Sequence, residues 1–324
     1  MFFWGSTNIV KSKRRLVRRA GGATLPFAIL ALILLVAACA PSPSPGNRNE
    51  QRRIVDDAER TVTLAQTPQR IISLAPSNTE LLFALGLNDR IVGVTDYCDY
   101  PPLARSKEKV GGFSTVNLEK VISLGPDLVL AANIHRQTAV PELERRGIPV
   151  FVLDRKTVDG VIDSLEVVAK LTRRDKEGSE ATSTLRSRMG EILSRIAAFS
   201  SYPRVFYELS PQLHTAGAGT LIDDIIARGG GTNVAAATSG AYPQLSLEFL
   251  VLQDPDVVLL GDMGSDEMQT VQPILNRPGW HSITAVKTGR VFVVDPSLTN
   301  RPGPRIVEGL DQVVRIIHAD RAAR

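Results

Sequence analysis

The chain has 324 residues, of which 43% are hydrophobic and 22% charged, with a formal net charge of +4. This length is typical of about two domains, and the composition excludes an intrinsically disordered chain. The first 38 residues hold six basic residues and no acidic one, so the remaining chain has 32 basic against 34 acidic residues. That balance gives no electrostatic basis for binding nucleic acid.

Residues 1–38 combine basic positions, an apolar run and small residues, which is typical of a secretory signal peptide. The segment VAAC at 36–39 resembles a bacterial lipobox, where the signal is cut before a cysteine that becomes lipidated. We therefore expect Cys39 to carry lipid. The alternative is a transmembrane anchor, because the apolar run is close to spanning length. A lipidated Cys39 leaves Cys98 without a partner for an intrachain disulfide.

Residues 39–66 are expected to form a Pro/Ser-rich tether and a small hairpin, followed by a first α/β lobe at 67–173. Polar residues at 77–80 are expected to cap the first helix of this lobe. Helices alternate here with nearly continuous apolar strands, which indicates a parallel sheet covered on both faces. The predicted strands lie at 70–76, 90–95, 127–132 and 149–154.

Residues 174–199 predict one long amphipathic helix, because apolar residues recur there at three- and four-residue steps. We expect this helix to bridge the first lobe and a second α/β lobe at 200–324. Such an arrangement crosses between the lobes once and leaves one cleft between them.

The second lobe repeats the first. The phrase NLEKVISLGPDLVL at 117–130 returns at 246–259 as SLEFLVLQDPDVVL, with six of fourteen positions identical. Two further pairs of similar segments occur in the same order, 68–76 with 203–211 and 150–154 with 291–295. We predict two similar Rossmann-like lobes with parallel sheets, and a ligand cleft at the carboxyl ends of their strands.

Motifs of catalysis are missing from the sequence. GAGTLI at 217–222 lacks the third glycine of a dinucleotide loop, and neither a G-x-S-x-G elbow nor a P-loop occurs. Asp127 and Asp256 precede buried strands and do not form an acid/base pair. The histidines have no zinc-site spacing. We therefore predict a binding protein with no catalytic residue, no cofactor and no structural metal.

The lipobox, the tether, RIISLAPSNTELLFALGL at 70–87, VGVTDYCDYPP at 92–102 and the central helix resemble one family. It comprises the substrate-binding lipoproteins of bacterial ABC importers for cobalamin, haem and iron–siderophore complexes, and the cobalamin branch is the most similar. The resemblance spans about residues 68–320. It implies a monomer, lipid-anchored on the extracytoplasmic face or in the periplasm, that delivers a corrinoid to a permease dimer with its ATPase subunits.

Two alternatives remain open at this point. A ferric siderophore or haem carrier would use the same fold. An extracytoplasmic chelatase or oxidoreductase would belong to another class and would need a nucleophile and base.

The repeat and the resemblance together indicate the site residues. Glu119 and Glu248 recur at equal offset near the starts of matched helices, and the resemblance implies that they meet arginines of the permease. The plainer alternative is that each carboxylate is stabilised by the dipole of its own helix. The same offset aligns Phe113 with Tyr242, which could close on a flat ligand from both lobes. The other residues expected to contact ligand follow the strands: Ser77, Asn78, Tyr97, Cys98, Asp99, His135, Ser210, His214 and Arg301.

Several of these residues also have a plainer interpretation. Ser77 and Asn78 would serve as helix caps, and Cys98 as a small buried residue. His135 or His214 could ligate the metal of a bound chelate. Tyr97 is the single strongest candidate for a ligand contact.

Overall fold

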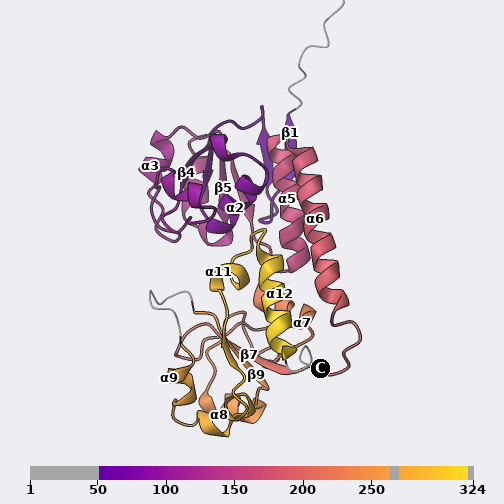
Figure 1. Cartoon of the computed structure of the whole chain (residues 1–324). Coiled ribbons are helices and arrows are strands. Elements are labelled where there is room, and N and C mark those ends of the chain that lie inside the picture. The colour runs from indigo at the N-terminus through magenta and orange to yellow at the C-terminus, as the bar shows by residue number, and fades with distance from the viewer. Residues whose placement is uncertain (1–50, 263–269, 320–324) are drawn as a thin grey trace, which may run out of the picture. The chain divides into compact units, whose positions relative to one another are not determined.

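The computed structural model describes residues 51–262 and 270–319 (Figure 1). The predicted signal peptide, the lipidation site Cys39 and the tether lie outside the described residues. Among the described residues, none of the helices has the length and apolar character needed to cross a membrane.

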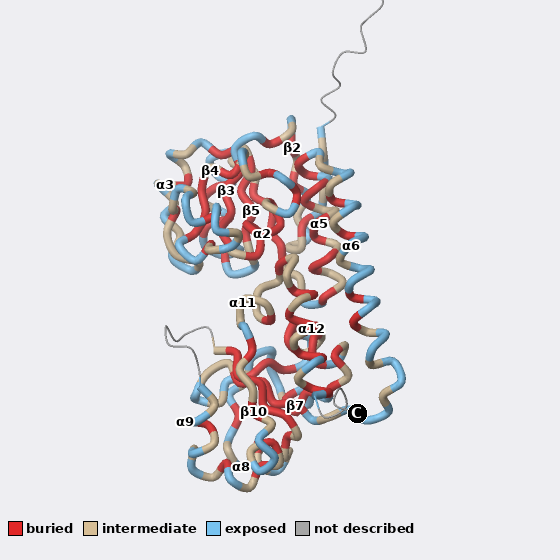
Figure 2. Tube along the Cα trace, in the orientation of Figure 1, coloured by how far each residue is buried: buried red, intermediate tan, exposed pale blue. Residues whose placement is uncertain are grey.

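The first lobe is built on a four-stranded parallel sheet of order β4-β3-β5-β6. Alternate residues of its central strands face two separate cores: Ile71 and Leu130 pack on one side, Ile72 and Val129 on the other. Figure 2 shows these strands as buried. The elements are β3 (Ile71–Ser73), α2 (Pro76–Ala84), β4 (Ile91–Val94), α3 (Leu118–Ser123), β5 (Leu128–Ala132), α4 (Ala139–Glu144) and β6 (Val150–Leu153).

The second lobe repeats this topology with the order β10-β9-β7-β8, again fully parallel. In both sheets the first strand of the lobe lies between the second and the third, and the fourth lies beyond the third. The predicted fold class, α/β with two similar parallel-sheet lobes, is confirmed. The elements are β7 (Arg204–Glu208), α7 (Leu221–Arg228), β8 (Thr232–Asn233), α8 (Leu247–Gln253), β9 (Val257–Leu260), α9 (Gln272–Leu275), α10 (Thr284–Lys287), β10 (Val291–Val293) and α11 (Pro296–Thr299).

Helix α6 (Asp175–Ser194) is the predicted long helix, and α5 (Val158–Thr172) runs beside it (Figure 1). The start of α5 belongs to the second lobe's core through Val158 and Ile162, whereas Leu165 and Val168 belong to the first lobe's core. The last helix, α12 (Ile306–Ile317), packs against both α5 and α6. The lobes are therefore joined by more than the single helix that we expected.

Part of the repeated phrase serves the fold itself. The Asp127 carboxylate accepts hydrogen bonds from the backbone N–H groups of Gln69 and Arg70 at 2.7 and 2.8 Å, where the chain enters β3. Asp256 does the same for Arg204 at 2.8 Å, at the start of β7. Each aspartate thus fixes the entry of its lobe's first strand.

The start of α2 differs from our expectation. We predicted residues 77–80 as caps, but the helix begins at Pro76 with Ala75 as N-cap, and no side chain caps it. Proline is well suited to the first helical position, because its fixed φ matches the helix and its missing N–H has no partner there anyway. The prediction was therefore wrong.

The residues that precede the first lobe form an antiparallel pair, β1 (Arg52–Val55) and β2 (Thr61–Leu64). The buried Asp56 between them accepts a hydrogen bond from Val152 N at 3.1 Å, which attaches this hairpin to β6.

Candidate functional site

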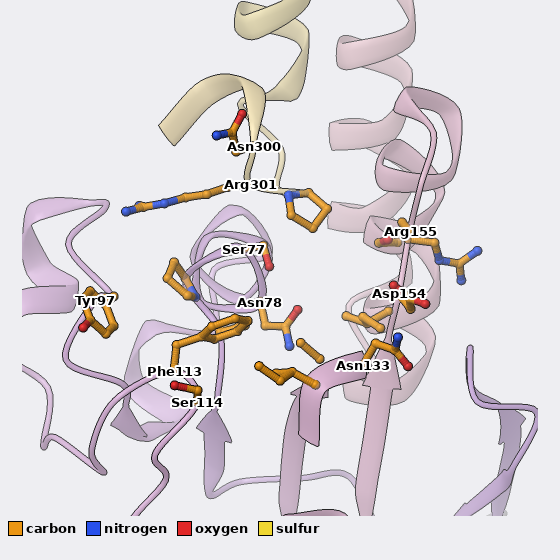
Figure 3. Close-up of a pocket in the computed structure, with 17 residues that line it drawn as sticks. Ser77, Asn78, Tyr97, Phe113, Ser114, Asn133, Asp154, Arg155, Asn300 and Arg301 are labelled. Atoms are coloured by element: carbon orange, nitrogen blue, oxygen red, sulfur yellow. The ribbon is translucent and has the colours of Figure 1, made fainter. Parts of the chain in front are cut away.

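A cavity of about 570 Å³ opens at the carboxyl ends of the first lobe's strands (Figure 3). One further wall comes from the loop between α11 and α12, in the second lobe. Parallel strands place the loops that follow them at a common edge, which is where ligands bind in open α/β sheets. The lining segments are 75–78, 113–114, 132–134, 153–155 and 300–302, together with Tyr97 and Ser164.

Apolar side chains face this cavity. Tyr97 is 62% exposed and Ile134 is 49% exposed, although both are large. Exposed aromatic and aliphatic surface within a concave site is a source of binding energy for an apolar ligand face. Phe113 adds a second ring to this wall, without a polar group of its own.

His135 lies behind Phe113 rather than on the cavity wall. It is 1% exposed, and its Nδ1 accepts a hydrogen bond from Ala132 N at 3.0 Å. Nε2 therefore carries the proton and donates to Phe113 O at 2.7 Å. Burial lowers the pKa of His135, which favours this neutral form. Since both ring nitrogens are engaged, His135 orients the Phe113 loop and neither nitrogen faces a ligand metal.

Arg301 reaches from the second lobe to the first. Its Nη1 donates to Asp99 Oδ1 at 2.7 Å and lies 3.9 Å from Glu80 Oε1. Partial burial raises the pKa of Asp99, but the hydrogen bond and the charge of Arg301 outweigh it and lower the pKa overall. Asp99 thus stays ionised and holds Arg301 beside the cavity.

Glu80 forms a second polar link between the lobes. Arg305 donates to both of its carboxylate oxygens, at 2.9 and 2.6 Å, and stacks over the Tyr100 ring at 3.8 Å. Burial raises the pKa of Glu80, and Arg305 opposes that increase. None of these contacts could be inferred from sequence spacing, because the partners lie 225 positions apart.

A buried hydrogen-bond cluster anchors the loop that carries Arg301. The Tyr207 hydroxyl lies 2.7 Å from Thr299 Oγ1 and donates to Asn300 Oδ1 at 2.7 Å, while Asn300 Nδ2 donates to Gly261 O at 2.8 Å. A Cβ on Gly261 would lie 1.9 Å from the Tyr207 hydroxyl oxygen, so only glycine leaves room for it. None of these residues was predicted to anchor this loop.

The structure brings together five of the predicted ligand-binding residues, which line the cavity: Ser77, Asn78, Tyr97, Phe113 and Arg301. Others on the wall were missed, among them Ser114, Asn133, Ile134, Asp154 and Arg155. Four of them follow a strand directly, Asn133 and Ile134 after β5 and Asp154 and Arg155 after β6, and that position was the available signal. Within the described residues, no group of three or more potential metal ligands occurs.

Cys98 lies in the core behind Tyr97. It is 1% exposed, and its sulfur lies 3.1 Å from Thr79 Oγ1 and 3.2 Å from Thr95 Oγ1. Cys98 is therefore a small buried residue and does not line the cavity.

Three predicted contacts lie on the second lobe and do not line this cavity. Ser210 Oγ and His214 Nδ1 are 2.9 Å apart on the loop after β7. Tyr242 is 64% exposed. Its pKa is raised by partial burial and then by the Asp154 carboxylate, which lies on the cavity wall of the first lobe.

Glu119 and Glu248 occupy matching places in α3 and α8. Both are exposed in the first turn, and the N-caps Asn117 and Ser246 accept equivalent backbone hydrogen bonds. A hydrogen bond from its own N–H, and then one from Ser246, lower the pKa of Glu248. Two exposed carboxylates therefore stand at equivalent points of the two lobes.

Comparison with known proteins agrees with this architecture. The chain is 34% identical over 318 residues to a cobalamin-binding protein of Halobacterium salinarum, covering 93% of this chain and 86% of that protein. It is 33% identical over 306 residues to an uncharacterized ABC transporter substrate-binding lipoprotein of Bacillus subtilis, covering 90% and 95%. The crystal structure of the periplasmic vitamin B12-binding protein of Vibrio cholerae matches with a TM-score of 0.69 and 29% identity, covering 78% and 97%.

The family itself follows from the extent of the match. Residues 71–298 match the periplasmic binding protein family, which spans both lobes and the helices between them. The relatives are binding proteins of ABC importers and not enzymes, which confirms the prediction of capture without catalysis. The chain belongs to the periplasmic binding protein family and is an extracytoplasmic solute-binding protein of an ABC importer.

Proposed function

We propose that this protein captures a cobalamin-type corrinoid and delivers it to the permease of an ABC importer. The observation that carries the proposal is the likeness to a cobalamin-binding protein over 93% of the chain. A cavity with exposed apolar and aromatic surface at the strand ends supports it.

The wall of the cavity suits a large, partly apolar ligand with amide arms. Tyr97, Phe113 and Ile134 offer flat and apolar surface, whereas Asn78 and Asn133 offer amide groups for hydrogen bonds. Tyr242 would close on the ligand from the second lobe. A corrin ring has an apolar body and a periphery of amide side arms, so both kinds of contact would be used.

Glu119 and Glu248 would dock the loaded protein on the permease. One exposed carboxylate on each lobe suits a two-fold partner that carries a basic residue in each half. The chain would act as a monomer, anchored through lipid on Cys39, in line with the relative that is named a lipoprotein. Replacing Cys39 by alanine would then release the protein from the membrane fraction or stall its processing.

The test is titration of the purified protein with cyanocobalamin, in which calorimetry and absorption spectroscopy measure binding. The proposal expects saturable binding of one corrinoid per chain. Binding of haem or a ferric siderophore without corrinoid binding would favour the alternative cargo on the same fold.

A further inference from the structure

We propose that the first turn of α2, the Ser77 hydroxyl and Arg301 form a subsite for an oxyanion of the ligand, a phosphate or carboxylate group. The inference rests on the proposed function, because the oxyanion would be a group of the ligand that the protein captures. It concerns one end of the cavity and adds a chemical requirement that the apolar wall does not impose.

The start of α2 presents N–H groups that nothing in the described structure engages. The first backbone hydrogen bond of the turn runs from Thr79 N to Ala75 O at 3.1 Å, so the N–H groups of Ser77 and Asn78 precede it. The N-cap is Ala75, which has no side chain to cap them. Uncapped N–H groups and the helix dipole together favour an anion at such a terminus.

The Ser77 side chain is an independent sign of a ligand. Ser77 is only 7% exposed and lines the cavity, between Arg301 and Asn78 in Figure 3. Across the ranges 51–262 and 270–319, no hydrogen bond engages its hydroxyl. Because the rest of Ser77 is buried and its hydroxyl opens on the cavity without a protein partner, a ligand group in the cavity can supply the missing hydrogen bond.

Arg301 supplies a positive charge on the adjoining wall of the same cavity. Its loop packs on α2, since a Cβ on Gly303 would lie 3.4 Å from Ser77 Cα and 3.2 Å from Glu80 Oε2. The Arg301 side chain is 12% exposed, and its Nε has no hydrogen-bond partner. A guanidinium with unused donors can bind an oxyanion with two parallel hydrogen bonds.

Two carboxylates near Arg301 have to be considered. Glu80 is already neutralised by the two hydrogen bonds from Arg305. Asp99 is the partner of Arg301, and its side chain is 45% exposed, so it can turn toward solvent when a ligand anion takes its place. Asp99 would thus occupy Arg301 in the empty protein and disfavour ligands that carry no anion.

The counterpart helix of the second lobe lacks such a vacancy. In α7 the N-cap Thr220 accepts a hydrogen bond from Asp223 N at 3.2 Å, and the Asp223 carboxylate accepts one from Gly219 N at 3.0 Å. The N-terminus of α7 is therefore capped by side chains, whereas that of α2 is not.

The test compares cobalamin, which carries a phosphodiester in its nucleotide loop, with cobinamide, which lacks that loop. The full-length chain in detergent is titrated with each corrinoid, as wild type and as the double variant Ser77→Ala with Arg301→Gln. Ser194→Ala is the matched control, because Ser194 is exposed on α6 and bonds only to Glu191 O. Melting curves establish that each variant is folded.

We expect wild type to bind cobalamin more tightly than cobinamide. The double variant should lose at least about tenfold of that preference, because its affinity for cobalamin falls further than its affinity for cobinamide, while the control keeps the preference. An unchanged preference in the double variant would overturn the subsite and leave corrinoid binding intact.

A wild type that binds neither corrinoid would refute the proposed function, and inorganic phosphate then decides the subsite. A ligand that binds only the folded state raises the melting temperature. At matched ionic strength, phosphate should raise it more for wild type and the control than for the double variant. An equal rise in all three would overturn the subsite.

Discussion

Replacing Arg305 by methionine would test the ion pair that links α2 to the segment before α12. Arg305 donates two hydrogen bonds to Glu80, whose side chain is 3% exposed. Loss of one partner of a buried ion pair costs about 3–5 kcal/mol, because the other charge remains uncompensated. Arg301, 3.9 Å from Glu80, compensates a part of it. We therefore expect a loss of about 2–4 kcal/mol in the free energy of unfolding at pH 7.

The pH dependence of this loss has a definite sign. Burial raises the pKa of Glu80 above its ordinary value, and Arg305 opposes that rise. Without Arg305 the pKa rises further. When a carboxyl group has a higher pKa in the folded state than in the unfolded state, the protein loses stability as the pH rises from the unfolded-state pKa to the folded-state pKa. The cost of Arg305→Met should therefore be smaller at pH 5 than at pH 7.

Urea unfolding followed by circular dichroism measures these differences. The cycle includes Glu80→Gln and the double variant, whose cost should fall short of the sum of the single costs by more than about 1 kcal/mol. Arg145→Met is the control, because Arg145 pairs with Glu142 on α4 while 68% exposed, and such pairs contribute about 0–1 kcal/mol. Additive costs, or a loss no larger than the control's, would refute the reasoning.

Three further predictions follow from exposed or paired side chains. Tyr97→Ala should weaken corrinoid binding about tenfold by calorimetry, with little change in melting temperature, because Tyr97 is 62% exposed; a much lower melting temperature with normal binding would contradict this. Glu119→Ala with Glu248→Ala should keep the corrinoid dissociation constant within about threefold and lower vesicle transport by about tenfold or more; normal transport, or lost binding, would exclude a docking role. Asp311→Asn should lower the melting temperature at pH 7. Burial raises the pKa of Asp311, but its two arginine partners outweigh burial and lower the pKa. The difference in melting temperature between wild type and variant should therefore shrink as the pH falls below about 3.8; a difference that stays constant with pH would contradict this.

The sequence predicted the architecture because its signals were local and repeated. The phrases at 117–130 and 246–259 contain an N-cap, a helix and a buried strand. Each signal is a property of a few neighbouring residues, so it can be read without the fold. The matching strand orders of the two sheets then follow from the repeat.

What the sequence did not predict depends on contacts between distant segments. The bond from Tyr207 to Asn300 and the pair of Glu80 with Arg305 join positions 93 and 225 residues apart. The role of α5 was missed for the same reason, because a helix shared by two cores shows an ordinary apolar pattern. The start of α2 was misjudged because Ser77 resembles a cap, whereas Pro76 already begins the helix.

Site residues fall between these cases. Residues in the segments that follow the strands, such as Ser77 after β3 and Phe113 after β4, were placed correctly at the cavity edge, because parallel strands bring their ends together. Whether such a side chain points into the cavity is decided by packing. Cys98 and His135 point into the protein because Thr79, Ala132 and Phe113 supply their partners.

The most direct test of corrinoid capture is the identity of the molecule that the protein retains. The full-length chain is incubated with equal concentrations of cyanocobalamin, haemin and a ferric siderophore, then separated by gel filtration. Absorption spectra and mass spectrometry of the protein fraction identify the bound compound. The account predicts one corrinoid per chain and little of the other two compounds. Retention of haemin or the ferric chelate in place of the corrinoid would contradict it.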